Sequence, residues 1–223
     1  MGLIQLDSYV LLLSGNDCIK FVDGLSTNKV TGTCTTVFTD QNAKIIDMVD
    51  VIEVGQQIAL VGFANYKEKL LRQLTSKILQ QDVAIRDITP NNKVYLSTKH
   101  FPPADGITVV PTFRGWLIVA SSSIQIDITL TLEEFNEYRV NNMIPHQGHE
   151  IVPNVHPFNC GLEHLVHEAK GCYIGQEILT RMRSRGFHGK KLMRRNNPAE
   201  HVTTQGYSQS LCIDRQEDEE QQS

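Results

Sequence analysis

The sequence predicts an α+β fold built on antiparallel sheets. Segments with the alternation of β-strands outnumber amphipathic helices, and several of them follow one another directly instead of alternating with helices. With 223 residues and 40% hydrophobic content, the chain can bury a sizeable core as one large domain or two small ones.

The first third of the chain predicts a strand, two helices and a hairpin. The apolar run within residues 1–15 is typical of a strand, and it lacks the basic start and cleavage site of a targeting segment. Apolar residues at helical spacing predict a short helix over 17–25. Residues 44–63 alternate and are rich in β-branched side chains, with Gly55 at the turn of a hairpin. A longer amphipathic helix is expected over 65–78.

The middle of the chain predicts more strands and a third helix. The expected strands are Val83–Ile88, Lys93–Ser97 and Gly115–Ala120. Thr131 and Glu134 form a capping-box pattern, which predicts a helix that continues to about Val140. After residue 196 the chain is polar with little periodicity, so a disordered tail is expected there.

Cysteine usage indicates a reducing compartment. The five cysteines are scattered, odd in number and without a C-x-x-C pair: Cys18, Cys34, Cys160, Cys172 and Cys212. This pattern argues against both a disulfide framework and a zinc ribbon. No apolar stretch approaches the roughly 20 residues that span a bilayer. We therefore expect a soluble, cytoplasmic protein without a membrane partner.

The stretch "AKGCYIGQEILTRMRSRG", residues 169–186, carries the strongest functional signal. A helix over 159–169 is expected to end at Gly171 in the left-handed conformation, which would leave Lys170 exposed. A second helix is expected to begin near Gly175. Cys172 would then lie between a lysine and a helix N-terminus, and both favour a thiolate. The alternative is that Cys172 is a small buried apolar side chain.

Gln176 and Glu177 add an amide and a carboxylate beside that cysteine. These groups suit the paired donors and acceptors of a flat heterocycle such as a pterin, or they hold the loop closed. An acid is also common in the first turn of a helix because it interacts favourably with the helix dipole.

Two other clusters of residues have the composition of binding sites. Five of the eight histidines fall within residues 146–167, but they lie in a polar segment with Pro and Gly and lack the spacing of a known metal motif, so no metal site is predicted. The basic residues over 181–195 could contact nucleic acid phosphates or an anionic folate tail, or they form a solvated helix face. Aromatic residues are sparse there, which argues against a nucleic acid partner.

The string Lys170-Gly171-Cys172-Tyr173-Ile174-Gly175-Gln176-Glu177, followed by Arg181 and Gly186, resembles the signature of the YgfZ family. These are folate-binding iron–sulfur maturation proteins related to the glycine-cleavage T-protein. Two further segments resemble this family: "GNDCIKFVDGLSTNKV" near the N-terminus and "YRVNNMIPHQGHEIVP", which contains Arg139 and Glu150.

The resemblance implies a T-protein-like folate-binding domain formed by residues 1–47 and 127–195. An inserted ferredoxin-like subdomain would cover 48–126, and the acidic tail 196–223 would follow in place of a full C-terminal β-barrel. The implied function is to support assembly or repair of four-iron four-sulfur clusters, with tetrahydrofolate as cofactor and with iron–sulfur assembly proteins or client enzymes as partners.

The resemblance also implies site residues. Cys172 and Lys170 would form the functional centre. The residues implied to contact folate are Gly171, Tyr173, Gly175, Gln176, Glu177, Arg181, Glu150 and Arg139.

Two departures from the pattern bear on activity. The paired aspartates of the T-protein read here as Asp47-Met48, and fewer than 40 residues follow Gly186. One alternative function is a folate-dependent aminomethyltransferase of the T-protein type. The other is an RNA-binding protein that uses the basic segment 181–195.

Overall fold

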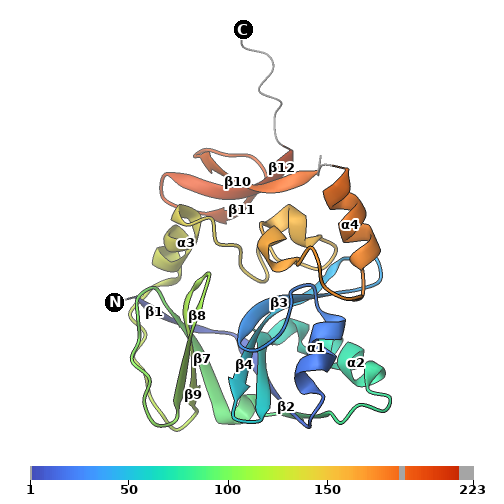
Figure 1. Cartoon of the computed structure of the whole chain (residues 1–223). Helices are drawn as coiled ribbons and strands as arrows, with labels where there is room; N and C mark the ends of the chain where they lie inside the picture. The colour runs from blue at the N-terminus through green and yellow to red at the C-terminus, as the bar shows by residue number, and fades with distance from the viewer. Residues whose placement is uncertain (1, 186–188, 216–223) are drawn as a thin grey trace.

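The computed structural model describes residues 2–185 and 189–215 of the chain. Within them, three antiparallel sheets and four α-helices form the fold, with the smallest sheet at the top of the view and the two larger sheets below it (Figure 1). The α+β class predicted from the sequence is confirmed.

The largest sheet has five strands in the order β3-β4-β5-β2-β6. Their bounds are β2 Ser8–Ser14, β3 Cys34–Thr39, β4 Ile45–Val54, β5 Gln57–Phe63 and β6 Ala84–Asp87. Helices α1 (Cys18–Leu25) and α2 (Lys67–Lys77) pack on one face of this sheet, as the periodicity predicts. The expected β4–β5 hairpin is confirmed, and its turn residue Gly55 has a φ of +61°.

A four-stranded sheet packs on the other face. Its order is β1-β7-β9-β8, and its strands are β1 Leu3–Leu6, β7 Asn92–Ser97, β8 Ile107–Thr112 and β9 Gly115–Ser121. The side chains of β2 alternate between the two cores: Tyr9 and Leu11 face the helices, while Val10 joins Val94 and Leu117 between the sheets. The apolar N-terminal run, expected as one strand, is divided between two sheets.

The third sheet corrects the expectation of a disordered tail. Strands β10 (Lys190–Asn196), β11 (Val202–Gln205) and β12 (Gln209–Arg215) pair in the order β10-β12-β11. Leu211 and Cys212 on β12 are fully buried, so this segment contributes to a core despite its polar composition. Residues 216–223 lie outside the described residues. The described part of the chain contains no closed barrel.

Helix α3 (Leu132–Asn141) contacts the third sheet, and its capping box is confirmed: the Thr131 side chain accepts from the Glu134 N–H, and the Glu134 side chain accepts from the Thr131 N–H.

The predicted domain boundary at 47/48 falls inside β4, which pairs with both β3 and β5. The predicted division therefore does not follow the sheets.

The segment before the signature is also different from the prediction. In place of a helix over 159–169, the structure has two short 3-10 turns, Pro157–Cys160 and Glu163–Leu165. Gly161 separates them with a φ of +78°, which a continuing helix does not allow. The second expected helix is confirmed as α4 (Gln176–Ser184).

Candidate functional site

The signature residues 170–177, here called the motif loop, follow the last 3-10 turn and include the first two residues of α4. Lys170 anchors the loop at its beginning. Its side chain is 1% exposed, and its ammonium group donates to the carbonyl oxygens of Asp23 (2.6 Å), Ser26 (2.9 Å) and Asn28 (2.7 Å). It also lies 3.0 Å from Oδ1 of Asp23. These acceptors follow one another at the C-terminal end of α1 and in the loop beyond it.

The expected exposure of Lys170 is therefore wrong. Burial lowers the pKa of Lys170, while the Asp23 carboxylate acts in the opposite direction. Burial acts to raise the pKa of Asp23, but hydrogen bonds from the Val30 N–H and from Lys170 outweigh it and the pKa is lowered. With its donors engaged by the protein, Lys170 joins the motif loop to α1.

Gly175 anchors the other end of the loop. It has a φ of +85°, and a Cβ at this position would lie 2.8 Å from the Asp40 carbonyl oxygen and 2.9 Å from the Ala43 Cα. Thr39 Oγ1 donates to the neighbouring Ile174 carbonyl at 2.6 Å. The left-handed residue predicted at Gly171 is thus wrong, because Gly175 takes that conformation. Gly171 is exposed, and no neighbouring atom lies within 4 Å of the position of its Cβ.

Tyr173 fixes the middle of the loop. Its ring is buried in a small core that includes Ala43, Phe158 and Leu179, and the Lys170 ammonium lies 5.4 Å from the ring centroid. Burial raises the pKa of the Tyr173 hydroxyl. The aromatic side chain therefore holds the loop to the body of the protein through packing.

Cys172 lies between these anchors and is exposed. Of the other four cysteines, three are buried and Cys34 is half-buried. Burial raises the pKa of the Cys34 thiol to about 11, and it also raises the pKa values of Cys18, Cys160 and Cys212. The alternative that Cys172 is a buried apolar side chain is wrong, and the thiol open to solvent is that of Cys172.

The polar residues after Cys172 line the solvent side of the loop and α4. Gln176 donates to the Lys170 carbonyl at 3.5 Å. The Glu177 side chain is 87% exposed and forms an i,i+4 ion pair with Arg181 at 3.3 Å. These side chains are accessible to a partner.

Arg139 and Glu150 form a separate, fully buried ion pair at 2.9 Å. Glu150 also accepts from Thr204 Oγ1 at 2.6 Å and from the His146 N–H at 3.0 Å, while Arg139 donates to Asn136 and Thr204 at 2.9 Å. The hydrogen bonds of this pair join α3 to the 146–150 turn and β11, and none of them reaches the motif loop.

A central pocket near the meeting of the two larger sheets contains polar residues that the sequence did not single out. Arg114, from the β8–β9 turn, pairs with the buried carboxylate of Asp50 on β4. Both line the pocket together with His146 and Gln147. Gln147 donates to the Met48 carbonyl at 2.9 Å, and burial lowers the pKa of His146 to about 3.

Asp47 is fully buried and does not line this pocket, but it contacts Phe63, which does. Its Oδ2 accepts from the Tyr9 hydroxyl at 2.8 Å and from the Phe63 N–H at 3.1 Å. Its Oδ1 has no hydrogen-bond partner in the described part of the chain, and neither does Nε of Arg114. Burial raises the pKa of Asp47 to about 7, although its hydrogen bonds act in the opposite direction.

Asp47 and Arg114 therefore provide one acceptor and one donor without partners. An acceptor and a donor are the kinds of group that pair with the edge of a pterin. The open volume of the central pocket is about 20 Å³, which is far below the roughly 300–1,000 Å³ of typical ligand pockets. Two aspartates in the apolar strand IIDMVDVI were a sequence signal for this site, whereas nothing in TFRGW marks Arg114.

Three arginines of the basic segment 181–195 are engaged by other parts of the described chain. Arg183 donates to the Val166 carbonyl at 2.7 Å and Arg194 to the Asn141 carbonyl at 2.8 Å, while Arg195 pairs with Asp214 at 3.7 Å. Within the described residues, no group of three or more His, Cys, Asp or Glu side chains could hold a metal ion. None of the described helices is long and apolar enough to cross a membrane.

The structure is similar to that of the glycine cleavage system aminomethyltransferase T from Bartonella henselae, with a TM-score of 0.74 and 11% sequence identity. The match covers 95% of this chain and 78% of that chain. No protein-family model and no curated protein sequence matches the chain. At this identity the likeness confirms the T-protein-like fold, and membership of the YgfZ family stays a prediction.

Proposed function

We propose that this protein binds a reduced folate in the central pocket and presents Cys172 to proteins that assemble or receive four-iron four-sulfur clusters. The observation that carries the proposal is the position of Cys172, an exposed thiol on a loop whose neighbours are anchored. The signature shared with the YgfZ family and the T-protein-like fold both support it.

The anchored loop suits an exchange of ligands with a partner. Iron–sulfur clusters are held by cysteine thiolates. Because Lys170, Tyr173 and Gly175 fix the backbone on both sides of Cys172, little conformational entropy is lost when the thiolate binds. A single cysteine supplies one ligand, so the remaining ligands come from the partner and the contact is transient.

The exposed groups beside Cys172 contact that partner. Gln176, Glu177 and Arg181 lie on the accessible side of α4 and the loop, where they recognise a protein surface rather than a buried ring. Glu150 and Arg139 act at a distance from the thiol, since their ion pair holds α3 and β11 together.

Tetrahydrofolate would supply a carrier for one-carbon units when bound. Asp47 Oδ1 would accept from an N–H of the pterin, and Arg114 Nε would donate to a ring acceptor. Because the pocket is small, Arg114 must move away from Asp50 for a ring to enter. Thermal unfolding with millimolar tetrahydrofolate tests this part: wild type is expected to gain stability, and Asp47→Asn to gain less.

Complementation tests the role of Cys172. In host cells depleted of the protein, Cys172→Ser is expected to leave the activity of four-iron four-sulfur enzymes low, while Cys34→Ser restores it. Both variants should unfold at the wild-type temperature or close to it. Full rescue by Cys172→Ser would overturn the proposal.

A second candidate is a folate-dependent aminomethyltransferase, favoured by the fold likeness to an aminomethyltransferase and by the buried Asp47, with its raised pKa, beside the central pocket. The assay is formation of methylenetetrahydrofolate from an aminomethyl-lipoyl donor. Product formation that is lost in Asp47→Asn but kept in Cys172→Ser would favour this function over the first.

A further inference from the structure

A slot separate from the central pocket and the motif loop lies between the two larger sheets, and we call it the inter-sheet slot. Its open volume is about 560 Å³, within the range of small-molecule sites. Ile52 and Ala59 of the five-stranded sheet form one wall, and Thr108 and Val119 of the four-stranded sheet form the other. The central pocket shares no lining residue with the slot.

The walls of the slot are apolar and continue the core between the sheets. Ile52 is 2% exposed and belongs to the cluster that joins the two sheets, and Val119 packs against the same cluster. Ala59 contributes only a methyl group to its wall. Val54, which also lines the slot, is 44% exposed, so the slot is open to solvent. Sheets that pack face to face lie about 10 Å apart, so the space left between their side chains is narrow and favours a flat ligand.

The polar lining of the slot has unused hydrogen-bonding groups. Among the described residues, the side chains of Gln57, Asn91 and Asp105 have no hydrogen-bond partner, and all three line the slot. Asp105 is the one ionisable residue in the lining. The slot therefore provides an apolar body, amide groups and a single negative charge, which disfavours phosphates and carboxylates.

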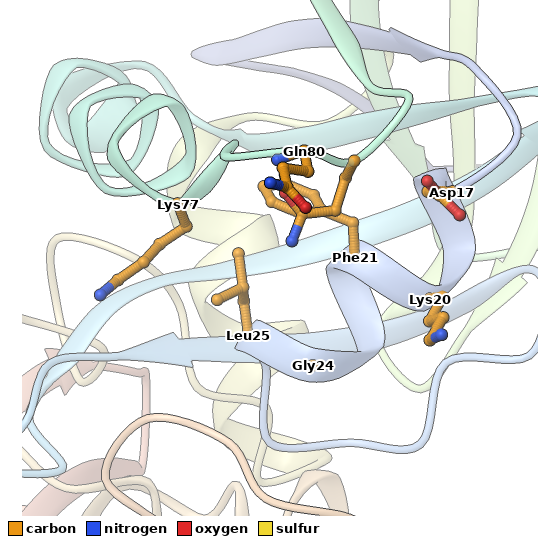
Figure 2. Close-up of a pocket in the computed structure, with 8 residues that line it drawn as sticks. Asp17, Lys20, Phe21, Gly24, Leu25, Lys77 and Gln80 are labelled. Carbon is orange, nitrogen blue, oxygen red and sulfur yellow. The ribbon is translucent and has the colours of Figure 1, made fainter.

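A second hollow on the surface is lined by positively charged side chains, in contrast to the inter-sheet slot. The groove between α1 and the C-terminal end of α2 has an open volume of about 410 Å³, with Phe21 and Leu25 between Lys20 and Lys77 (Figure 2). Neither lysine forms an ion pair with another described residue. The carboxylate of Asp17 in this groove accepts from the Asp82 N–H at 2.8 Å. This groove favours anions, so the charge of a bound compound reports which hollow it occupies.

We propose that the inter-sheet slot binds a flat aromatic heterocycle that carries one positive charge. The ring lies between Val54 and Val119, the partly exposed apolar side chains of the two sheets, and the cationic amino group pairs with Asp105 at the mouth. The proposal does not depend on folate binding, because the slot and the central pocket share no lining residue.

Three compounds with the same bicyclic ring test the proposal: tryptamine, which is cationic, indole, which is neutral, and indole-3-acetate, which is anionic. Their binding is followed by methyl NMR shifts of the full chain. An exposed ion pair is worth about 0.2–1 kcal/mol, so tryptamine is expected to bind up to about fivefold more tightly than indole. The largest shifts are expected at Val54 and Val119.

Variants separate the slot from other surfaces. Asp105→Asn is expected to remove the preference for tryptamine over indole, whereas Asp127→Asn, which neutralises an exposed carboxylate outside the slot, keeps it. Thr108→Trp places a large side chain at the exposed rim and is expected to weaken all three compounds. Shifts at Leu25 instead of Val119, equal binding of the three compounds, or an unchanged preference in Asp105→Asn would each overturn the proposal.

Discussion

Lys170→Met tests whether the signature lysine is a structural anchor. Methionine keeps most of the length of the side chain but removes the ammonium group, so three backbone carbonyls and one oxygen of Asp23 lose their donor. Breaking a buried ion pair costs about 3–5 kcal/mol. Because the Asp23 side chain is 32% exposed and regains water, we expect a loss near the lower end, about 3 kcal/mol.

Urea unfolding followed by circular dichroism measures this loss by linear extrapolation. For a chain of this size, about 2–4 °C per kcal/mol corresponds to a melting temperature lower by about 6–12 °C. Lys77→Met is the matched control, since Lys77 is exposed and forms no ion pair with the described residues, and it should change stability by less than about 0.5 kcal/mol. A Lys170→Met protein as stable as the control would refute the anchoring argument.

Three further predictions concern the loop and the central pocket. Gly175→Ala should destabilise the protein by about 2–4 kcal/mol, because its φ is left-handed and a Cβ would meet backbone atoms, whereas Gly171→Ala should cost less than about 0.5 kcal/mol in the same urea assay. Alkylation with a limiting reagent near neutral pH, read by mass spectrometry, should label Cys172 first, and equal labelling of Cys34 would contradict this. Asp47 holds its proton up to about pH 7 when folded but only to about pH 4 when unfolded, so its contribution to stability is present below pH 4 and is lost as the pH rises through 7. Between pH 5 and 8 this loss is about 3 kcal/mol, and Asp47→Asn should remove that part of the pH dependence of unfolding; parallel pH profiles would contradict the assignment.

Periodicity predicted the elements whose apolar side chains face a single core. Helix α1 is an example, because Phe21 and Val22 pack on the same face of the same sheet. The expected helix over 159–169 was wrong because its apolar residues belong to two cores. Leu162 and Leu165 pack with Met48, while Val166 packs with Tyr173, so their helical spacing was a coincidence.

The third sheet was missed for a related reason. Strand β10 reads KKLMRRN, and its side chains are half-buried or exposed without the alternation that marks a half-buried strand. Its pairing depends on β12, whose Leu211 and Cys212 are buried and which also contacts α3, far earlier in the sequence. Local patterns cannot indicate a strand whose stability comes from its partner.

The sequence predicted a reactive cysteine in the motif loop, but it did not show which residues of the loop are structural. Sequence placed a lysine beside a cysteine, and both were expected to act at the surface. The acceptors of Lys170 lie more than 140 positions earlier, at Asp23, Ser26 and Asn28, so only the folded chain separates the buried cation from the exposed thiol. If Lys170, Tyr173 and Gly175 hold the backbone while Cys172 alone is free to react, loss of Cys172 should leave the fold intact, whereas loss of any of the other three should lower stability.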